Sequence, residues 1–167
     1  MLIVNYQLFI RRKMAIRKIV KGGDPVLHKK SRVVEKFDDR LAQLLDDMIQ
    51  TMHEAKGCGL AAVQVGVLRR AFVVDTGDGA IELVNPEIIG REGVQREEEG
   101  CLSYPGEFGV TRRPAVVRLR AQNRQGKWCF YKADGLKARA FCHECDHLDG
   151  VVFKERWMQP QPKSQQK

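Results

Sequence analysis

The segment Phe141-Cys142-His143-Glu144-Cys145-Asp146-His147-Leu148 places two histidines four positions apart, with a glutamate directly after the first. On an α-helix a step of four residues turns roughly 400°, so His143 and His147 project from the same face and can bind one metal ion. Two imidazoles beside a carboxylate suit a hydrolytic site, because the nitrogens bind the metal and Glu144 can accept a proton from metal-bound water. The segment therefore predicts a helix that carries a metal site.

A third ligand has to complete this site, since a His-Glu-x-x-His string also occurs on ordinary polar helices. In the metzincin pattern a third histidine follows the second by six positions, where this chain has Phe153. Glu155 is the only glutamate after His147, and it follows the apolar run 151–153. The remaining ligand is therefore expected upstream of the helix.

The length and composition favour one globular domain in a reducing compartment. The chain has 167 residues, of which 43% are hydrophobic, and five cysteines. The odd number of cysteines, without a cleavable secretory signal, indicates a reduced, cytoplasmic protein. Cys142 and Cys145 form a Cys-x-x-Cys pair, which raises a redox or zinc-ribbon interpretation. Because no second such pair exists and this one lies in a helical run, two core cysteines are favoured, and an oxidised pair is the alternative.

The net charge of +8 is confined to the start of the chain. Residues 1–33 hold nine lysines and arginines and one acid, Asp24, while the basic and acidic residues after them balance. The positive charge is therefore concentrated in an N-terminal segment and does not form a basic surface across the domain. A solvated arm is favoured, a contact with ribosomal RNA at the ribosome surface is the alternative, and no DNA-binding module accompanies the charge.

The first 13 residues are interpreted as an extension of the domain. The apolar run 1–10 precedes Arg11-Arg12-Lys13, which is the wrong order for a signal peptide, and it is too short to span a membrane. Met14 is a second candidate start. We therefore expect a single catalytic domain at 14–157, followed by a disordered polar tail at 158–167.

The order of predicted elements indicates the α+β class. A helix is expected over 38–56, capped by Asp38 and stopped by Gly57, because apolar residues recur at helical spacing. His53 in this helix is interpreted as a partly exposed residue, not a ligand. Strands are expected at 71–74, 81–84, 93–99, 110–122 and 128–132, with a turn at 123–126. Antiparallel or mixed sheets would then pack around the C-terminal helix, expected over 136–149, that carries the metal motif.

Two glycine-containing segments between the helices offer further polar groups. Gly57 and Gly59 flank Cys58, and Gln64 is a polar amide within the apolar run that follows. Cys101 follows a glycine near the end of a predicted strand, where a thiolate can approach a metal with little steric hindrance. A buried cysteine is the ordinary alternative. With His143 and His147, Cys101 would complete a Cys-His-His set that leaves one position for water.

These motifs occur together in the order found in the peptide deformylase family, which the sequence resembles over about Ala15 to Trp157. They are Gly57-x-Gly59-Leu60-Ala61-Ala62-x-Gln64, then Glu99-Gly100-Cys101-Leu102-Ser103, then His143-Glu144-x-x-His147. The segment Gly23-Asp24-Pro25-Val26-Leu27 also matches a frequent opening of the family. The resemblance implies a monomeric hydrolase that removes the formyl group from the N-formylmethionine of nascent proteins and releases formate.

Residue by residue, the resemblance implies that Cys101, His143 and His147 bind one divalent metal and that Glu144 is the general acid and base. The metal of the family is typically Fe²⁺ in cells, and Zn²⁺, Ni²⁺ or Co²⁺ can replace it. Gln64, through its side-chain amide, would donate a hydrogen bond to the formyl oxygen.

Leu102 would add its backbone N–H as a second donor to the same oxygen. The resemblance further implies that the backbones of Gly59 and Gly100 pair with the extended substrate. The methionine side chain is expected to contact a pocket built by four residues: Cys58, Leu136, Arg139 and Ala140.

Two acids near the motifs, Glu99 and Asp146, are candidates to orient ligands or to hold an arginine such as Arg113, with solvated surface carboxylates as the alternative. The chain departs from the family at Cys142, where glutamine is usual. It also lacks the long C-terminal helix with which some members dock to the ribosome. A metallopeptidase and a degenerate binding protein are the rival interpretations. The cysteine ligand and the missing downstream ligand argue against the first, and the intact ligands and glutamate argue against the second.

Overall fold

The structure is a computed structural model that describes residues 15–158. The predicted extension at 1–13 and the predicted tail beyond Met158 lie outside the described residues. Met158 itself is attached to the domain, because its N–H donates a hydrogen bond to the carbonyl of Val110 at 2.8 Å. None of the helices between 15 and 158 has the length and apolar character required to cross a membrane.

Two antiparallel sheets form the β part of the fold. The larger has the strand order β1-β2-β3-β6-β7, and the smaller pairs β4 with β5. The strands are β1 (Gly59–Ala61), β2 (Ala71–Val74), β3 (Ile81–Glu92), β4 (Gln95–Cys101), β5 (Tyr104–Arg113), β6 (Val116–Gln122) and β7 (Trp128–Asp134).

The two α-helices cover opposite faces of the larger sheet. They are α1 (Asp39–Glu54) and α2 (Gly135–Leu148), and three short 3-10 helices accompany them: η1 (Pro25–His28), η2 (Ala62–Val65) and η3 (Phe153–Arg156). Along β2, Ala71 and Val73 pack in the apolar cluster with α1, whereas Phe72 and Val74 pack in the cluster with α2. The alternation explains why all four residues of this strand are apolar and buried.

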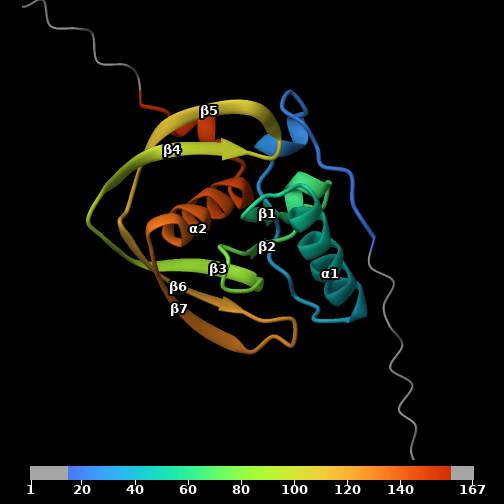
Figure 1. Cartoon of the computed structure of the whole chain (residues 1–167). Helices are drawn as coiled ribbons and strands as arrows, with labels where there is room; N and C mark the ends of the chain where they lie inside the picture. The colour runs from blue at the N-terminus through green and yellow to red at the C-terminus, as the bar shows by residue number, and fades with distance from the viewer. Residues whose placement is uncertain (1–14, 159–167) are drawn as a thin grey trace, which may run out of the picture.

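Figure 1 shows α2 enclosed between the larger sheet and the β4–β5 ribbon. The predicted α+β class, with antiparallel sheets around a C-terminal helix, is confirmed. A third apolar cluster, which includes Leu27, Tyr104 and Phe153, joins the ribbon to the segments η1 and η3. The metal motif therefore lies on an element that is covered from both sides.

The prediction of one strand over 110–122 is wrong. The structure ends β5 at Arg113 and begins β6 at Val116, and the two strands belong to different sheets. Pro114 lies between them, and because proline has no N–H to donate it interrupts the ladder where the chain changes sheets. The strand predicted at 81–84 instead continues to Glu92, and the next begins at Gln95 after Gly93, which has a φ of 63°.

Helix α1 begins as predicted and ends at Glu54, two residues earlier than expected. The carboxylate of Asp38 accepts the N–H of Leu41 at 3.0 Å, which caps the first turn. At the other end Lys56, not Gly57, has the left-handed φ of 54° that stops the helix. His53 is half exposed and its Nε2 lies 2.9 Å from the carboxylate of Asp75, which confirms that it is a surface residue.

Candidate metal centre

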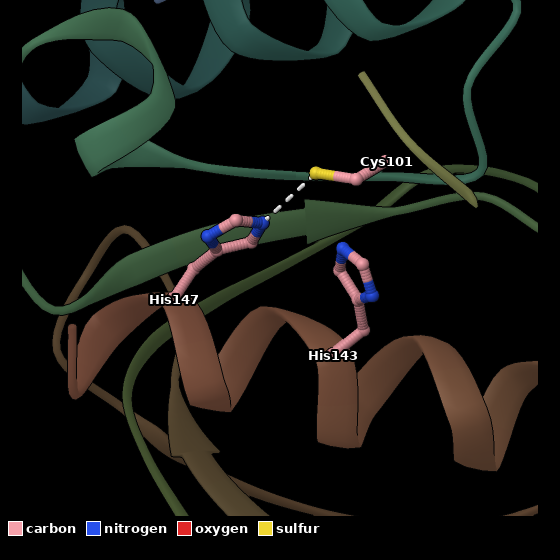
Figure 2. Close-up of side chains that lie close together, drawn as sticks. All are labelled: Cys101, His143 and His147. Carbon is pink, nitrogen blue, oxygen red and sulfur yellow. Dashed lines mark hydrogen bonds between the residues drawn. The ribbon is translucent and has the colours of Figure 1, made fainter. Parts of the chain in front are cut away.

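The structure brings together the three predicted ligands from two elements. Cys101 is the last residue of β4, and His143 and His147 lie one turn apart on α2. Their ligand atoms all lie within 4.8 Å of one another, and the sulfur of Cys101 is 3.3 Å from Nε2 of His147. Figure 2 shows the cysteine pointing from the strand toward both rings. The site depends on the packing of the end of β4 against the C-terminal half of the helix.

The residues present fit a divalent transition metal. One thiolate and two imidazoles are a donor set that such ions prefer, and three protein ligands are typical of sites that keep a position for water. His143 Nδ1 lies 3.0 Å from a carboxylate oxygen of Glu99, so Nε2 is the nitrogen left for a ligand bond. Glu144 Oε2 is buried and has no hydrogen-bond partner among residues 15–158. A water bound to the metal would give this carboxylate oxygen the hydrogen-bond partner that it lacks.

Glu144 follows His143 on α2 and is 3% exposed. Burial raises the pKa of its carboxyl to about 7, although the neighbouring His143 opposes the shift. A group with a pKa in this range can both accept and return a proton near neutral pH. A Cβ at Gly59 would lie 2.3 Å from Glu144 Oε1, so the glycine leaves the space that this carboxylate occupies.

A buried network supports the first histidine. Arg113 donates to both oxygens of Glu99, at 2.7 and 3.0 Å, and its remaining amino group donates to Asp146 at 2.6 Å. The Glu99 and Arg113 side chains are each 6% exposed. Burial alone would raise the pKa of Glu99, but its hydrogen bonds with His143 and Arg113 hold that pKa well below its usual range. The prediction that Glu99 and Asp146 hold Arg113 is confirmed.

Gln64 lies on η2 with its amide directed at the cysteine. Its Oε1 accepts the N–H of Ala61 at 2.8 Å, which fixes the amide, and its Nε2 lies 3.1 Å from the hydroxyl of Ser103 and 3.5 Å from the sulfur of Cys101. The side chain is 1% exposed. The amide N–H groups of Gln64 therefore face the region where an oxygen bound beside the metal would lie.

Leu102 is held from the other side by the N-terminal segment. The ammonium of Lys21 donates to the Leu102 carbonyl at 2.9 Å, and the backbone N–H groups of Val20 and Gly22 donate to the carbonyls of Gln64 and Ser103. Residues 20–22 thus link the two segments that carry the predicted donors. Lys21 was not predicted from the sequence, because there it is only one of nine basic residues among the first 33.

An open cavity of about 530 Å³ lies over this centre. All six predicted substrate-contacting residues line it: Cys58, Gly59, Gly100, Leu136, Arg139 and Ala140. The guanidinium of Arg139 donates to the carbonyl of Glu98 at 3.1 Å, so its head is anchored at the rim. Burial, reinforced by Glu144, raises the pKa of the Cys58 thiol and keeps that group neutral.

Phe108 is a further lining residue that the sequence did not single out. It is paired with Gly100 across the β4–β5 ribbon and is 62% exposed, with its ring where a Cβ on Gly100 would fall. A large exposed aromatic ring at the mouth of a cavity offers an apolar surface to a peptide. No spacing pattern marks this residue, so only the register of the ribbon could reveal it.

Comparisons with known proteins agree on one family. Residues 16–163 match the family model described as polypeptide deformylase. Peptide deformylase of Alkaliphilus metalliredigens is 57% identical over 143 residues, which cover 86% of this chain and 97% of the relative. The crystal structure of peptide deformylase from Thermotoga maritima has a TM-score of 0.85 and 40% identity, and the match covers 87% of this chain and 99% of the other. The Met-Ala-Ser-bound structure of class I type b peptide deformylase from Acinetobacter baumannii has a TM-score of 0.81 and 33% identity, covering 85% and 98%.

Proposed function

This chain belongs to the peptide deformylase family, and on that premise we propose how its own residues remove the formyl group from the N-formylmethionine of newly synthesised proteins. The family is metal-dependent and its reaction releases formate. The observation that carries the proposal is the convergence of one cysteine, two histidines and a buried glutamate under a cavity open to solvent.

Cys101, His143 and His147 are proposed to hold the metal. The mixed sulfur and nitrogen donors support a divalent transition metal. Membership of the family favours Fe²⁺ in cells, with Zn²⁺, Ni²⁺ or Co²⁺ as substitutes. When bound, the metal would supply Lewis acidity that polarises the attacking water and the formyl oxygen. The hydrogen bond between His143 and Glu99 would orient the ring of that ligand and increase its basicity.

Glu144 is proposed to carry the proton between the two halves of the reaction. Its carboxylate would accept a proton from the attacking water and then donate it to the departing amine nitrogen of methionine. Burial of this group, with a pKa raised to about 7, supports both steps at neutral pH. Its unpartnered Oε2 is available for the water.

Gln64 and Leu102 are proposed to stabilise the formyl oxygen as it gains negative charge. The Gln64 amide and the Leu102 backbone N–H would each donate a hydrogen bond to that oxygen, and loss of one such donor typically lowers the rate by about 10²–10³. The Gln64 amide is already fixed by its bond from Ala61 N–H. A donor held in place before the reaction loses no free energy to reorganisation during it.

The substrate is proposed to lie as an added strand between Gly59 and Gly100, which pair with it through their backbones. Its methionine side chain would contact Cys58, Leu136 and Ala140 and the aliphatic stem of Arg139. The position of these residues around one cavity supports this arrangement. Met-Ala-Ser bound to the Acinetobacter baumannii relative supports a peptide ligand of the same kind.

We further propose that the enzyme acts in the cytoplasm as a monomer with a single catalytic domain, on nascent formylated chains. A cavity built within one chain supports a monomer. The exposed basic residues that precede η1 and follow it, among them Lys18, Lys29 and Lys30, support a contact with the ribosome surface.

The substitution Glu144→Gln tests the proposed chemistry. With Fe²⁺ or Ni²⁺ loaded under anaerobic conditions, formate release from formyl-Met-Ala-Ser should fall by about 10²–10⁴, because the proton carrier is lost. Metal analysis should find the same metal content as in the wild type, since all three ligands remain. Glu97→Gln makes the same change at an exposed position of β4 that does not line the cavity, so it is the control and should keep wild-type turnover.

Two results would contradict the proposal. One is absence of formate from the wild-type protein with Fe²⁺, Ni²⁺ or Co²⁺ loaded. The other is wild-type turnover by Glu144→Gln.

A further inference from the structure

A second cavity, of about 660 Å³, lies against a different face of α2 from the metal ligands. Cys142, Cys145 and Asp146 contribute to it from the helix, and none of the residues that line it also lines the first cavity. Its other walls come from β3, from the end of β5 and from Arg156 of η3. The cavity is therefore separate from the proposed substrate site.

Arginine dominates the lining of this cavity. Five arginines and three carboxylates line it: Arg70, Arg91, Arg112, Arg113 and Arg156, with Glu87, Asp146 and Asp149. Each carboxylate already has a cationic partner. Asp146 binds Arg113 and Arg156, and Asp149 binds Arg70 at 2.7 Å. Glu87 binds Arg120, which lies outside the lining, at 2.6 Å.

Two guanidinium groups remain without a carboxylate. Neither Arg91, on β3, nor Arg112, on β5, has an ion pair within 4.0 Å in the described part of the chain, and both are exposed. The two strands belong to different sheets, so these side chains reach the cavity from separate walls. The uncompensated charge of the lining is thus positive and is supplied by two planar donors.

We propose that this cavity binds a ligand through its phosphate groups. Arginine presents parallel N–H donors that match two oxygens of a phosphate, and two arginines that line one cavity can bind one phosphate or adjacent phosphates. The volume falls within the range of small-molecule sites. Apolar lining by Pro86 and Ile88 leaves a surface for a part of the ligand that carries no charge.

Free polyphosphate and the backbone of RNA share this chemistry, and two probes distinguish them. Inorganic pyrophosphate and a single-stranded RNA of ten nucleotides are titrated separately into the full-length, metal-loaded protein at low salt, with binding measured by calorimetry. Saturable 1:1 binding of pyrophosphate indicates a small phosphorylated ligand. Saturable binding of the RNA alone indicates the backbone of a nucleic acid, and its affinity should fall as salt rises.

The double variant Arg91→Ala/Arg112→Ala should bind either probe at least about tenfold more weakly, because it removes the charge-assisted hydrogen bonds to the phosphate oxygens. The matched control Lys36→Ala/Arg40→Ala removes the same charge from exposed positions just before and within α1, and should bind as the wild type does. Formate release should be unchanged in both double variants, which verifies that they fold.

A third variant separates a specific site from general attraction. Arg91→Lys/Arg112→Lys keeps both charges but removes the paired donors, and it should bind several-fold more weakly than the wild type. Equal binding by this variant would overturn the proposal. So would an absence of saturable binding for both probes, or an equal loss in the Lys36→Ala/Arg40→Ala control.

Discussion

Glu99 connects the arginine of β5 to a proposed metal ligand. One of its oxygens lies 3.0 Å from His143 Nδ1, and Arg113 donates to both of its oxygens. The carboxylate is buried, so its charge depends on these partners. Because the hydrogen bond directs the other ring nitrogen toward Cys101, Glu99 is a positioning residue for the metal centre.

Glu99→Gln should weaken metal binding by about 10–100-fold, as is typical when the hydrogen-bond partner of a metal-bound histidine is altered. The amide keeps the shape of the side chain but loses the negative charge that supports His143 and compensates Arg113. Competition with a coloured chelator measures the affinity. Glu97→Gln, an exposed position on the same strand, serves as the control, and equal affinities for the two variants would refute this role.

The sequence was informative for residues that belong to a pattern. Cys101, His143 and His147 could be proposed together because three motifs occur in one order, and Arg113 followed from the acids beside those motifs. Lys21 and Phe108 could not be predicted. Lys21 contacts the Leu102 carbonyl across 81 positions of sequence, and Phe108 depends on a strand register. Contacts of this range are determined by the tertiary fold and leave no local signal.

At the level of elements, type and order were predicted better than boundaries. The α1 cap and the turn at 123–126 follow from local chemistry, since Asp38 caps its own helix and the Gly126 N–H donates to the Asn123 carbonyl. The division at Pro114 was missed because strand-forming residues stand on both sides of it, Val110 and Thr111 before and Val116 and Val117 after, although the chain changes sheets there. Which sheet a strand joins depends on tertiary packing, which local sequence does not specify.

The end of α1 gives a prediction about backbone strain. Lys56 has a φ of 54°, a left-handed conformation that costs a residue with a side chain roughly 1 kcal/mol relative to glycine. Lys56→Gly should therefore increase the free energy of unfolding by up to about 1 kcal/mol. Urea denaturation measures this change. Glu54→Gly, within the last turn of the same helix, should have the opposite effect, and destabilisation by both substitutions would contradict the argument.

Across the whole molecule, the segment 15–22 joins parts that the sheet does not connect. At its start, the carboxylate of Asp47 on α1 accepts the Ala15 N–H at 2.9 Å and binds the guanidinium of Arg17. Further on, the segment reaches the carbonyls of Gln64 and Ser103. The helix on one face of the sheet is thereby tied to the segments beside the metal centre. Asp47 is the anchor of this connection.

Asp47→Asn tests the anchor through the pH dependence of stability. Burial alone would raise the pKa of Asp47, but hydrogen bonds from Ala15, Gln43 and Arg17 outweigh burial and lower it. A lowered folded-state pKa means that the carboxylate stabilises the fold above its unfolded pKa of about 4, and that this contribution disappears as the pH falls through the folded-state value. The wild type should exceed Asp47→Asn by about 1–3 kcal/mol at pH 7, and by progressively less below about pH 4.

Urea unfolding of the metal-free proteins at pH 7 and at about pH 3 measures both differences without a contribution from metal loss. Glu54→Gln makes the same change of charge at an exposed position of the same helix, and it should alter stability by less than about 0.5 kcal/mol at either pH. If the gap between the wild type and Asp47→Asn were the same at both pH values, its origin would be the shape of the side chain rather than its charge. The segment 15–22 would then be held by packing and by its backbone hydrogen bonds, and the ion pair with Arg17 would contribute nothing to the connection.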